Sequence, residues 1–301
     1  MRVAFLVPNN KFGAYAFVEI KCELARRHHS SDLLDDSLVI SKDTSFDIII
    51  HKWPQLLSNT SLCSKIDQIY YKILTPVTTL KHTLYRSSMF SLFYEPVCGV
   101  LHFPTNHVIN LPPNSGKWID AVNSVVNHSN ELYPVVIKPD IACGTKSSHH
   151  LAVVPASSSL PDQITTTVPS GECVLQPFFP GSLLKFYVIS LSPSCTILWK
   201  SDCSAFHPQI TNFQKEVFLF DSQKLKPKDP SIKRCFDSNW LEIAVQINNK
   251  LNLTFFGFDV VVSDNCNYCV DINYFPSFSG CQNFGELAVD ALEAHLKLKT
   301  N

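Results

Sequence analysis

The residues best suited to chemistry lie in one short stretch, FGFDVVVSDNCNYCVDINYFP, at residues 256–276. Two apolar runs flank a polar turn, and this pattern predicts an antiparallel β-hairpin. Each run nevertheless carries an acid, Asp259 in the first and Asp271 in the second, with Asn273 two residues further on. Because alternate residues of a strand face the same side, Asp271 and Asn273 point together, and a tight hairpin places Asp259 across from them.

Two neighbouring carboxylates are costly to bury, because like charges repel and both groups lose hydration. A divalent cation removes both penalties, and a few oxygen ligands suit Mg²⁺ better than zinc. The alternative is that each acid caps or stabilises a turn. Cys266 and Cys269 have metal-ligand spacing, but no second pair or nearby histidine completes a zinc site, so buried thiols are the favoured interpretation.

A second candidate region is a strand, a polar loop and another strand at residues 134–154. The first strand ends at Lys138, and the loop places Gly144 among serines and a threonine. Backbone N–H groups exposed by small residues bind anions, and a lysine adds a point charge. No GxxxxGK[ST] motif is present, so the pattern predicts a flap over phosphates rather than a P-loop.

The elements that must position these residues begin with a small α/β unit. Residues 2–8 and 46–50 read as buried strands on either side of a helix at 16–26, which predicts a parallel sheet. Ligands of such sheets bind beyond the carboxyl ends of the strands, where Lys11 and Lys52 lie. The alternative is that both lysines only solvate loops.

The rest of the chain alternates between further helices and strands. Helical patterns cover residues 78–93, 117–126, 240–251 and 284–292, and strand patterns cover 134–139, 151–154, 172–179 and 184–191. The helix at 240–251 is amphipathic and is expected to pack beside the hairpin.

Composition limits the classes of function. The chain has 301 residues, 45% of them hydrophobic and 17% charged, which is typical of a folded protein with more than one core. The net charge is −1 and no long basic run occurs, so nucleic acid and anionic membranes are poor partners. No apolar run approaches the ~18 residues of a membrane span, and no signal peptide is evident. We therefore expect a cytoplasmic protein that binds any anionic ligand in a local pocket of scattered basic residues.

Taken together, the motifs resemble the inositol-tetrakisphosphate 1-kinase family (inositol 1,3,4-trisphosphate 5/6-kinases), which has the ATP-grasp fold. The core of the resemblance is the order IKP-x-x-ACGT-x-x-SH, LQ-x-F, FGFDV and VDINYFP. It extends over nearly the whole chain through DIIIHK, LYRSS and VFLFDSQ, and through Lys11 near the N-terminus.

The resemblance implies an α/β fold in three parts. Residues 1–95 would form an N-terminal domain with a small parallel sheet, 96–191 a central ATP-grasp subdomain, and 192–301 a C-terminal subdomain with the metal site. ATP would bind between two antiparallel-sheet subdomains. The implied reaction is direct in-line transfer of the ATP γ-phosphoryl group to a hydroxyl of an inositol tris- or tetrakisphosphate, with Mg²⁺ as cofactor and a monomer as the working unit.

Position by position, the resemblance also implies roles for individual residues. The implied metal ligands are Asp259, Asp271 and Asn273. The implied ATP contacts are Arg86, Lys138, Lys200, Ser222 and the hinge residues Gln176, Pro177, Phe178 and Phe179. The implied inositol phosphate contacts are Lys11, Lys52, His149, Lys185, Asn273 and Ser277, with His149 and Lys185 also as catalytic candidates.

The sequence departs from the family pattern around these grooves. The flap commonly reads GTAKSH in the family and reads GTKSSH here, from Gly144. The Asn-His element after the hinge is replaced by Pro-Gly-Ser at residues 180–182, a Lys-Arg-Pro-Ser element is reduced to Lys200, and Ser277 replaces a glycine. These departures concern substrate specificity and efficiency more than the fold. Two alternatives therefore remain, a carboxylate–amine ligase of the ATP-grasp fold and a degenerate nucleotide-binding scaffold.

Overall fold

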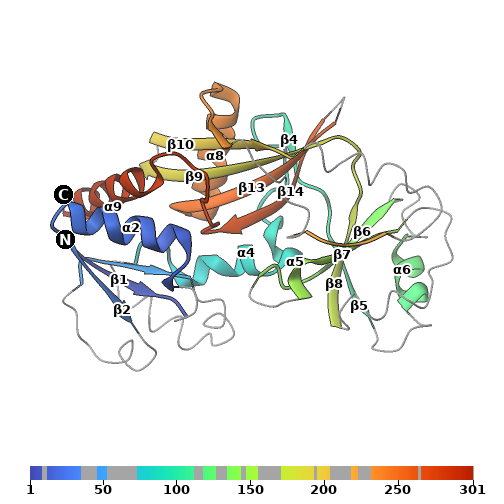
Figure 1. Cartoon of the computed structure of the whole chain (residues 1–301). Helices are drawn as coiled ribbons and strands as arrows, with labels where there is room; N and C mark the ends of the chain where they lie inside the picture. The colour runs from blue at the N-terminus through green and yellow to red at the C-terminus, as the bar shows by residue number, and fades with distance from the viewer. Residues whose placement is uncertain are drawn as a thin grey trace.

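The computed structural model describes residues 1–8, 12–34, 46–52, 73–111, 118–126, 134–143, 147–154, 171–192, 195–203, 218–222, 232–263 and 266–300. In these residues the chain forms sheets of three, six and five strands. Figure 1 shows the three-stranded sheet beside both termini, the six-stranded sheet in the middle and the five-stranded sheet at the far end. The expected α/β architecture with parallel and antiparallel sheets is confirmed.

The three-stranded sheet is the predicted parallel unit. Its strands β1 (Arg2–Leu6), β2 (Ser30–Leu34) and β3 (Ile48–His51) pair in parallel in the order β2-β1-β3. Helix α2 (Tyr15–Arg26) connects β1 to β2 and buries one face. Because β3 ends at His51, Lys52 lies just past a carboxyl end as predicted, whereas Lys11 falls outside the described residues.

The six-stranded sheet carries the hairpin. Its order is β12-β10-β9-β13-β14-β4, with β4 (Leu101–His102), β9 (Ser182–Ser192), β10 (Cys195–Asp202), β12 (Ile232–Arg234), β13 (Phe255–Val262) and β14 (Asn267–Tyr274). Helix α8 (Ser238–Leu251) covers one face through the predicted apolar stripe, which is buried against Phe186, Phe258 and Ile272. Asp237 caps this helix by accepting hydrogen bonds from the backbone N–H groups of Asn239 and Trp240.

The five-stranded sheet is antiparallel, with the order β11-β7-β6-β8-β5. It contains β5 (His107–Leu111), β6 (Val135–Pro139), β7 (His150–Val154), β8 (Gly171–Pro177) and β11 (Phe218–Asp221). Helix α6 (Trp118–Val126) packs on it through Val122 and Val126. The chain passes from this sheet to the six-stranded one between β8 and β9, where the predicted hinge lies.

The helix predicted at residues 78–93 is interrupted at Tyr85 and ends at Met89. The segment contains η2 (Val77–Leu80), α4 (Lys81–Leu84) and α5 (Arg86–Met89), with Tyr85 in extended conformation between the last two. Tyr85 forms a β-bridge with Ile141, and backbone bonds join Arg86 N to Asp140 O and Ala142 N to Leu84 O. Pairing with the segment after β6 therefore replaces the helical hydrogen bonds and fixes the backbone of Arg86.

The predicted boundaries at residues 95 and 191 remain predictions, because the sheets exchange strands across them. β4 belongs to the six-stranded sheet although it lies within the predicted central subdomain. β11 pairs with β7 in the five-stranded sheet although it lies within the predicted C-terminal subdomain.

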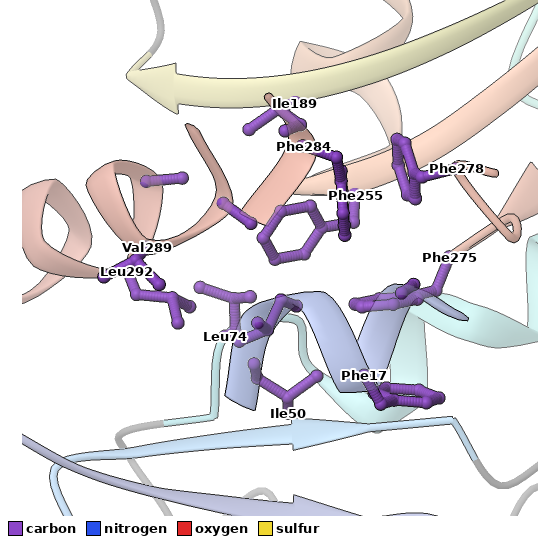
Figure 2. Close-up of a cluster of buried hydrophobic side chains, with 14 of the residues drawn as sticks. Phe17, Ile50, Leu74, Ile189, Phe255, Phe275, Phe278, Phe284, Val289 and Leu292 are labelled. Atoms are coloured by element: carbon purple, nitrogen blue, oxygen red, sulfur yellow. The ribbon is translucent and has the colours of Figure 1, made fainter. Parts of the chain in front are cut away.

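An aromatic core joins the three-stranded sheet to the six-stranded one. Figure 2 shows Phe17 and Ile50 below, Phe255, Phe278 and Phe284 above, and Phe275 between them. The rings of Phe17 and Phe275 stack with centroids 5.0 Å apart and planes inclined by 14°. Helix α9 (Phe284–Thr300) lies over α2 on the same side of the molecule (Figure 1). This core holds the N-terminal unit against the end of β14, where the candidate metal ligands lie.

Within the part of the chain that the structure describes, no helix combines the length and apolar character needed to cross a membrane.

Candidate active site

The hairpin brings the two acids together as predicted. In the antiparallel pairing of β13 with β14, Asp259 lies opposite Asp271, and Gly257 lies opposite Asn273. Ile272, between Asp271 and Asn273, points to the other face and is fully buried in the core under α8. One face of the hairpin therefore presents two carboxylates and one carboxamide.

Lys185 supplies a counter-ion from the neighbouring strand β9, where it pairs with Asp259. Its Nζ donates a hydrogen bond to Asp259 Oδ2 at a distance of 2.5 Å. Burial raises the pKa of Asp259 and the Asp271 charge adds to this, whereas Lys185 lowers it, with a raised pKa as the net result. Burial lowers the pKa of Lys185, but the charge of Asp259, its hydrogen bond to the lysine and the charge of Asp271 together outweigh burial, and the pKa is raised. The half-buried lysine thus stays charged and compensates one of the two acids.

The negative charge of Asp271 is less completely compensated by neighbouring groups than that of Asp259. Its Oδ2 accepts a hydrogen bond from Asn273 Nδ2 at 3.2 Å, and its Oδ1 lies 3.9 Å from Arg86 Nε. That Oδ1 atom is buried and accepts no hydrogen bond from any described residue. A buried anionic oxygen without a donor is expensive, and a bound cation would relieve it.

The donor set fits Mg²⁺. Among the described residues, no three His, Cys, Asp or Glu side chains come close enough to hold a metal. A cation at the hairpin would therefore use two carboxylates, the Asn273 amide oxygen and outside oxygens. Mg²⁺ commonly binds in this way, because it retains waters and takes phosphate oxygens. Cys269 instead lies in the buried core, where its Sγ donates to the Asp271 carbonyl at 3.7 Å.

Lys138 joins the two large sheets. It lies on β6, is 7% exposed, and donates to Gln176 Oε1 at 2.6 Å and to the Val270 carbonyl of β14 at 2.9 Å. Burial lowers its pKa to about 8, although the charge of Asp271 opposes this. The ammonium group is therefore enclosed beside the hairpin and poorly compensated.

Arg86 lies between the hairpin and the start of the flap. Its guanidinium donates from Nη1 to the Pro139 carbonyl at 2.6 Å and from Nη2 to the Ser148 carbonyl at 3.3 Å. Asp140 holds the same turn, since its Oδ1 accepts from Ser87 N at 2.7 Å. Sequence reasoning missed Asp140, and the only available signal was an acid directly after the Lys-Pro pair.

The predicted hinge connects the two large sheets. The Phe178 N–H already donates to the Pro134 carbonyl at 2.7 Å, and the Phe179 ring stacks on Tyr268 of β14 with centroids 3.6 Å apart. Gly181 adopts φ +149°, and a Cβ there would lie 2.1 Å from the Val262 carbonyl oxygen. The glycine of the Pro-Gly-Ser sequence at residues 180–182 thus allows the chain to pack directly against the end of β13. Pro177, three residues before this sequence, is the last residue of β8.

Lys52 reaches the other end of the hairpin. Its Nζ donates to the Phe275 carbonyl at 2.5 Å, and the Tyr274 hydroxyl donates to the His51 carbonyl at 2.7 Å. Burial raises the pKa of the Cys143 thiol, while the charges of Lys52 and Arg86 lower it and that of Asp271 raises it. These three charges therefore surround the beginning of the flap.

The remaining predicted residues are less closely joined to the hairpin. His149 Nδ1 lies 3.4 Å from Ser222 Oγ, so these two residues meet each other on the five-stranded sheet. Ser277 is exposed in the loop after Phe275. Lys200 pairs with Phe186, whose ring packs on Trp240 of α8, so its side chain starts from the face opposite the acids. Ser201, which pairs with Lys185 and is 1% exposed, occupies the acidic face instead.

Comparison with protein families gives one match over most of the region just described. Residues 114–294 match the family model of the inositol 1,3,4-trisphosphate 5/6-kinase ATP-grasp domain. Inositol-tetrakisphosphate 1-kinase 6 of Oryza sativa subsp. indica is 27% identical over 156 residues, which are 48% of this chain and 28% of that protein. The chain thus spans under a third of that longer relative.

Another relative aligns over more of the chain. Inositol-tetrakisphosphate 1-kinase 1 of the same rice subspecies is 25% identical over 279 residues, covering 86% of this chain and 74% of that protein. The crystal structure of the D-cycloserine synthetase DcsG superposes with a TM-score of 0.65 at 12% identity, covering 98% of this chain and 100% of that one. At such identity the likeness concerns the fold alone. The ATP-grasp fold expected from the sequence is confirmed.

Proposed function

The chain belongs to the inositol 1,3,4-trisphosphate 5/6-kinase ATP-grasp family, and on this premise we propose that it transfers the γ-phosphoryl group of ATP to a hydroxyl of an inositol tris- or tetrakisphosphate. The observation that carries the proposal is the meeting of three cationic side chains with the acidic hairpin. Lys138 comes from the five-stranded sheet, Lys185 from the six-stranded sheet, and Arg86 from the short helix between the sheets.

The nucleotide would bind between the two large sheets. Lys138 and Arg86 would contact its phosphates, because both side chains are buried and both lie beside the hairpin. The adenine would lie against the hinge. The Phe178 N–H already donates to the Pro134 carbonyl, so the backbone of Phe179 is the better candidate to form hydrogen bonds with the base. Gln176, Pro177 and Ser222 would complete this half of the site.

Asp259, Asp271 and Asn273 would hold Mg²⁺, which when bound neutralises the phosphate charge that develops during transfer. The fit rests on the unpartnered Asp271 Oδ1 and on the all-oxygen donor set. Lys185 occupies Asp259 Oδ2 in the present arrangement. The Lys185 ammonium group therefore lies at the acidic face of the hairpin, where it would also contact an incoming phosphate.

The inositol phosphate would bind at the other end of the hairpin. Lys52 is fixed there by the Phe275 carbonyl, and Phe275 is anchored in turn by the stacked ring of Phe17. Lys185, His149, Lys11, Asn273 and Ser277 are the other proposed contacts. A chain of net charge −1 would in this way hold a polyanion with a few local cations. These residues would position the hydroxyl in line with the γ-phosphoryl group, the arrangement that such transfers require.

The test is to incubate the protein with ATP, Mg²⁺ and a panel of inositol tris- and tetrakisphosphates, and to separate the products by charge. We expect at least one substrate to gain a phosphate. ATP binding without turnover of any member would refute the kinase proposal and favour the scaffold alternative. Acyl phosphate formation from a carboxylate would favour the ligase alternative.

A further inference from the structure

Asn106, to which the proposed function gives no role, ends a chain of hydrogen bonds that starts at Lys138. Lys138 Nζ donates to Gln176 Oε1 at 2.6 Å. Gln176 Nε2 donates to Asn106 Oδ1 at 3.1 Å, and Asn106 Nδ2 donates to the Arg86 carbonyl at 2.7 Å. Two side chains, those of Gln176 and Asn106, thus connect the buried ammonium group of Lys138 to the backbone of a second basic residue.

The direction of every bond in this chain is fixed by its two ends. A lysine can only donate, so the oxygen of Gln176 must face it and the amide nitrogen of Gln176 must face Asn106. A carbonyl can only accept, so the amide nitrogen of Asn106 must face Arg86 and its oxygen must face Gln176. Both requirements agree, and neither amide can flip without setting two like groups against each other.

The strand register explains why these residues meet. Gln176 pairs with Val136, two residues before Lys138 on β6, so the Gln176 and Lys138 side chains share a face of the sheet. His107 pairs with Leu175, so Asn106, one residue earlier, reaches the level of Gln176. Gln176 is 2% exposed and Lys138 is 7% exposed, so water has little access to substitute for a missing partner.

Two of the three ammonium protons of Lys138 donate to acceptors among the described residues, Gln176 Oε1 and the Val270 carbonyl. These two bonds determine where the third proton points. Among the described residues, Asn106 is the acceptor that holds the amide nitrogen of Gln176. A change at Asn106 should therefore alter how Lys138 meets a phosphate, although Asn106 need not touch the nucleotide.

We propose that Asn106 is a positioning residue that acts through Gln176 to aim the Lys138 ammonium group at the phosphates of ATP. This role rests on the proposed function, because it requires ATP to bind beside Lys138. It makes Asn106 one link between the hinge strand β8 and the backbone that carries Arg86.

The experiment is a double-mutant cycle on nucleotide affinity. The dissociation constant of ATP with Mg²⁺ is measured by calorimetry for the wild type, Asn106→Ala, Lys138→Ala and the double variant. The matched control is Asn110→Ala, which removes an exposed asparagine from the adjacent strand β5. Thermal unfolding of each variant is recorded, and Asn106→Ser serves as a second variant if the alanine destabilises the fold.

We expect Asn106→Ala to weaken ATP binding about fivefold, the typical effect of one lost hydrogen bond, and Asn110→Ala to leave it unchanged. In the Lys138→Ala background the Asn106 substitution should have almost no further effect, because the group it positions is gone. An equal loss in both backgrounds, or normal affinity in both Asn106 variants, would overturn the inference. A wild type that binds no ATP would instead refute the proposed function itself.

Discussion

ATP binding should depend on pH through Lys138. Burial lowers the pKa of this lysine from 10.5 to about 8, so a large fraction of the free protein carries a neutral amine at mildly alkaline pH. The phosphates of ATP favour the charged form, because an opposite charge in close contact stabilises an ammonium ion. Nucleotide binding should then be accompanied by proton uptake.

The magnitude follows from the pKa. If only the charged form binds, the apparent affinity for ATP falls ~10-fold between pH 7 and pH 9, and uptake at pH 8 is ~0.5 proton per ATP. Asp271, Arg86, Asp259 and the Cys269 thiol also face Lys138 and contribute to this value. The lowered pKa of Lys138 also makes the stability of the fold depend on pH. The folded state binds fewer protons than the unfolded state between about pH 8 and 10.5, so the free energy of unfolding should rise with pH across that window.

Calorimetry in two buffers of different ionisation enthalpy measures the uptake directly. Lys138→Met should abolish the uptake measured at pH 8 and flatten the pH profile of affinity. Lys233→Met, which removes an exposed lysine, should change neither. The reasoning is refuted if wild-type protein takes up no proton at pH 8 and binds ATP equally well at pH 7 and pH 9.

Three further predictions concern the hairpin and its neighbours. Asp271→Asn should reduce the rate of phosphoryl transfer by at least about 100-fold. It should also abolish the rise in melting temperature that Mg²⁺ with ATP gives the wild type, and a retained rise would show that Asp271 does not bind the metal. Lys52→Met should raise the KM for inositol phosphate about tenfold and change the Kd of ATP less than twofold, because Lys52 binds the Phe275 carbonyl away from Lys138; equal loss of both affinities would make it a structural residue. Gly257→Ala should destabilise the fold by ~1–3 kcal/mol in denaturant unfolding, because its Cβ would lie 2.8 Å from the Phe186 carbonyl oxygen. Gly13→Ala, with open space around it, should not destabilise the fold. Similar unfolding midpoints for the two variants would contradict this packing argument.

Most of the hairpin could be predicted from the sequence, because its signals are local. The alternation of apolar and polar residues indicated the strands, and the period of two placed Asp271 and Asn273 on one face. The exact register was not predictable: the pairing of Val262 with Asn267 next to the turn would set Asp259 against Val270, and an irregularity between Asp259 and Val260 brings Asp271 there instead. The parallel unit with Lys52 at its edge was predictable as well, because its apolar strands and its helix also give local signals in the sequence.

Residues that depend on long-range pairing were not predictable in this way. Asp140 and Asn106 gain their roles only when the segment after β6 pairs with residues 84–86 and when β5 pairs with β8. The same pairing breaks the expected helix at Tyr85, against its local pattern. The face of Lys200 likewise depends on the register of β10 against β9, which no pattern within residues 195–202 reveals.

The most direct test of the central claim follows the γ-phosphoryl group itself. ATP labelled at the γ-phosphate is incubated with Mg²⁺, an inositol trisphosphate and either wild-type protein or Asp271→Asn, and the label is traced after one turnover. The account predicts that the label appears on the inositol phosphate with the wild type, none on the protein, and almost no transfer with the variant. Label released only as inorganic phosphate, or equal transfer by both proteins, would contradict it.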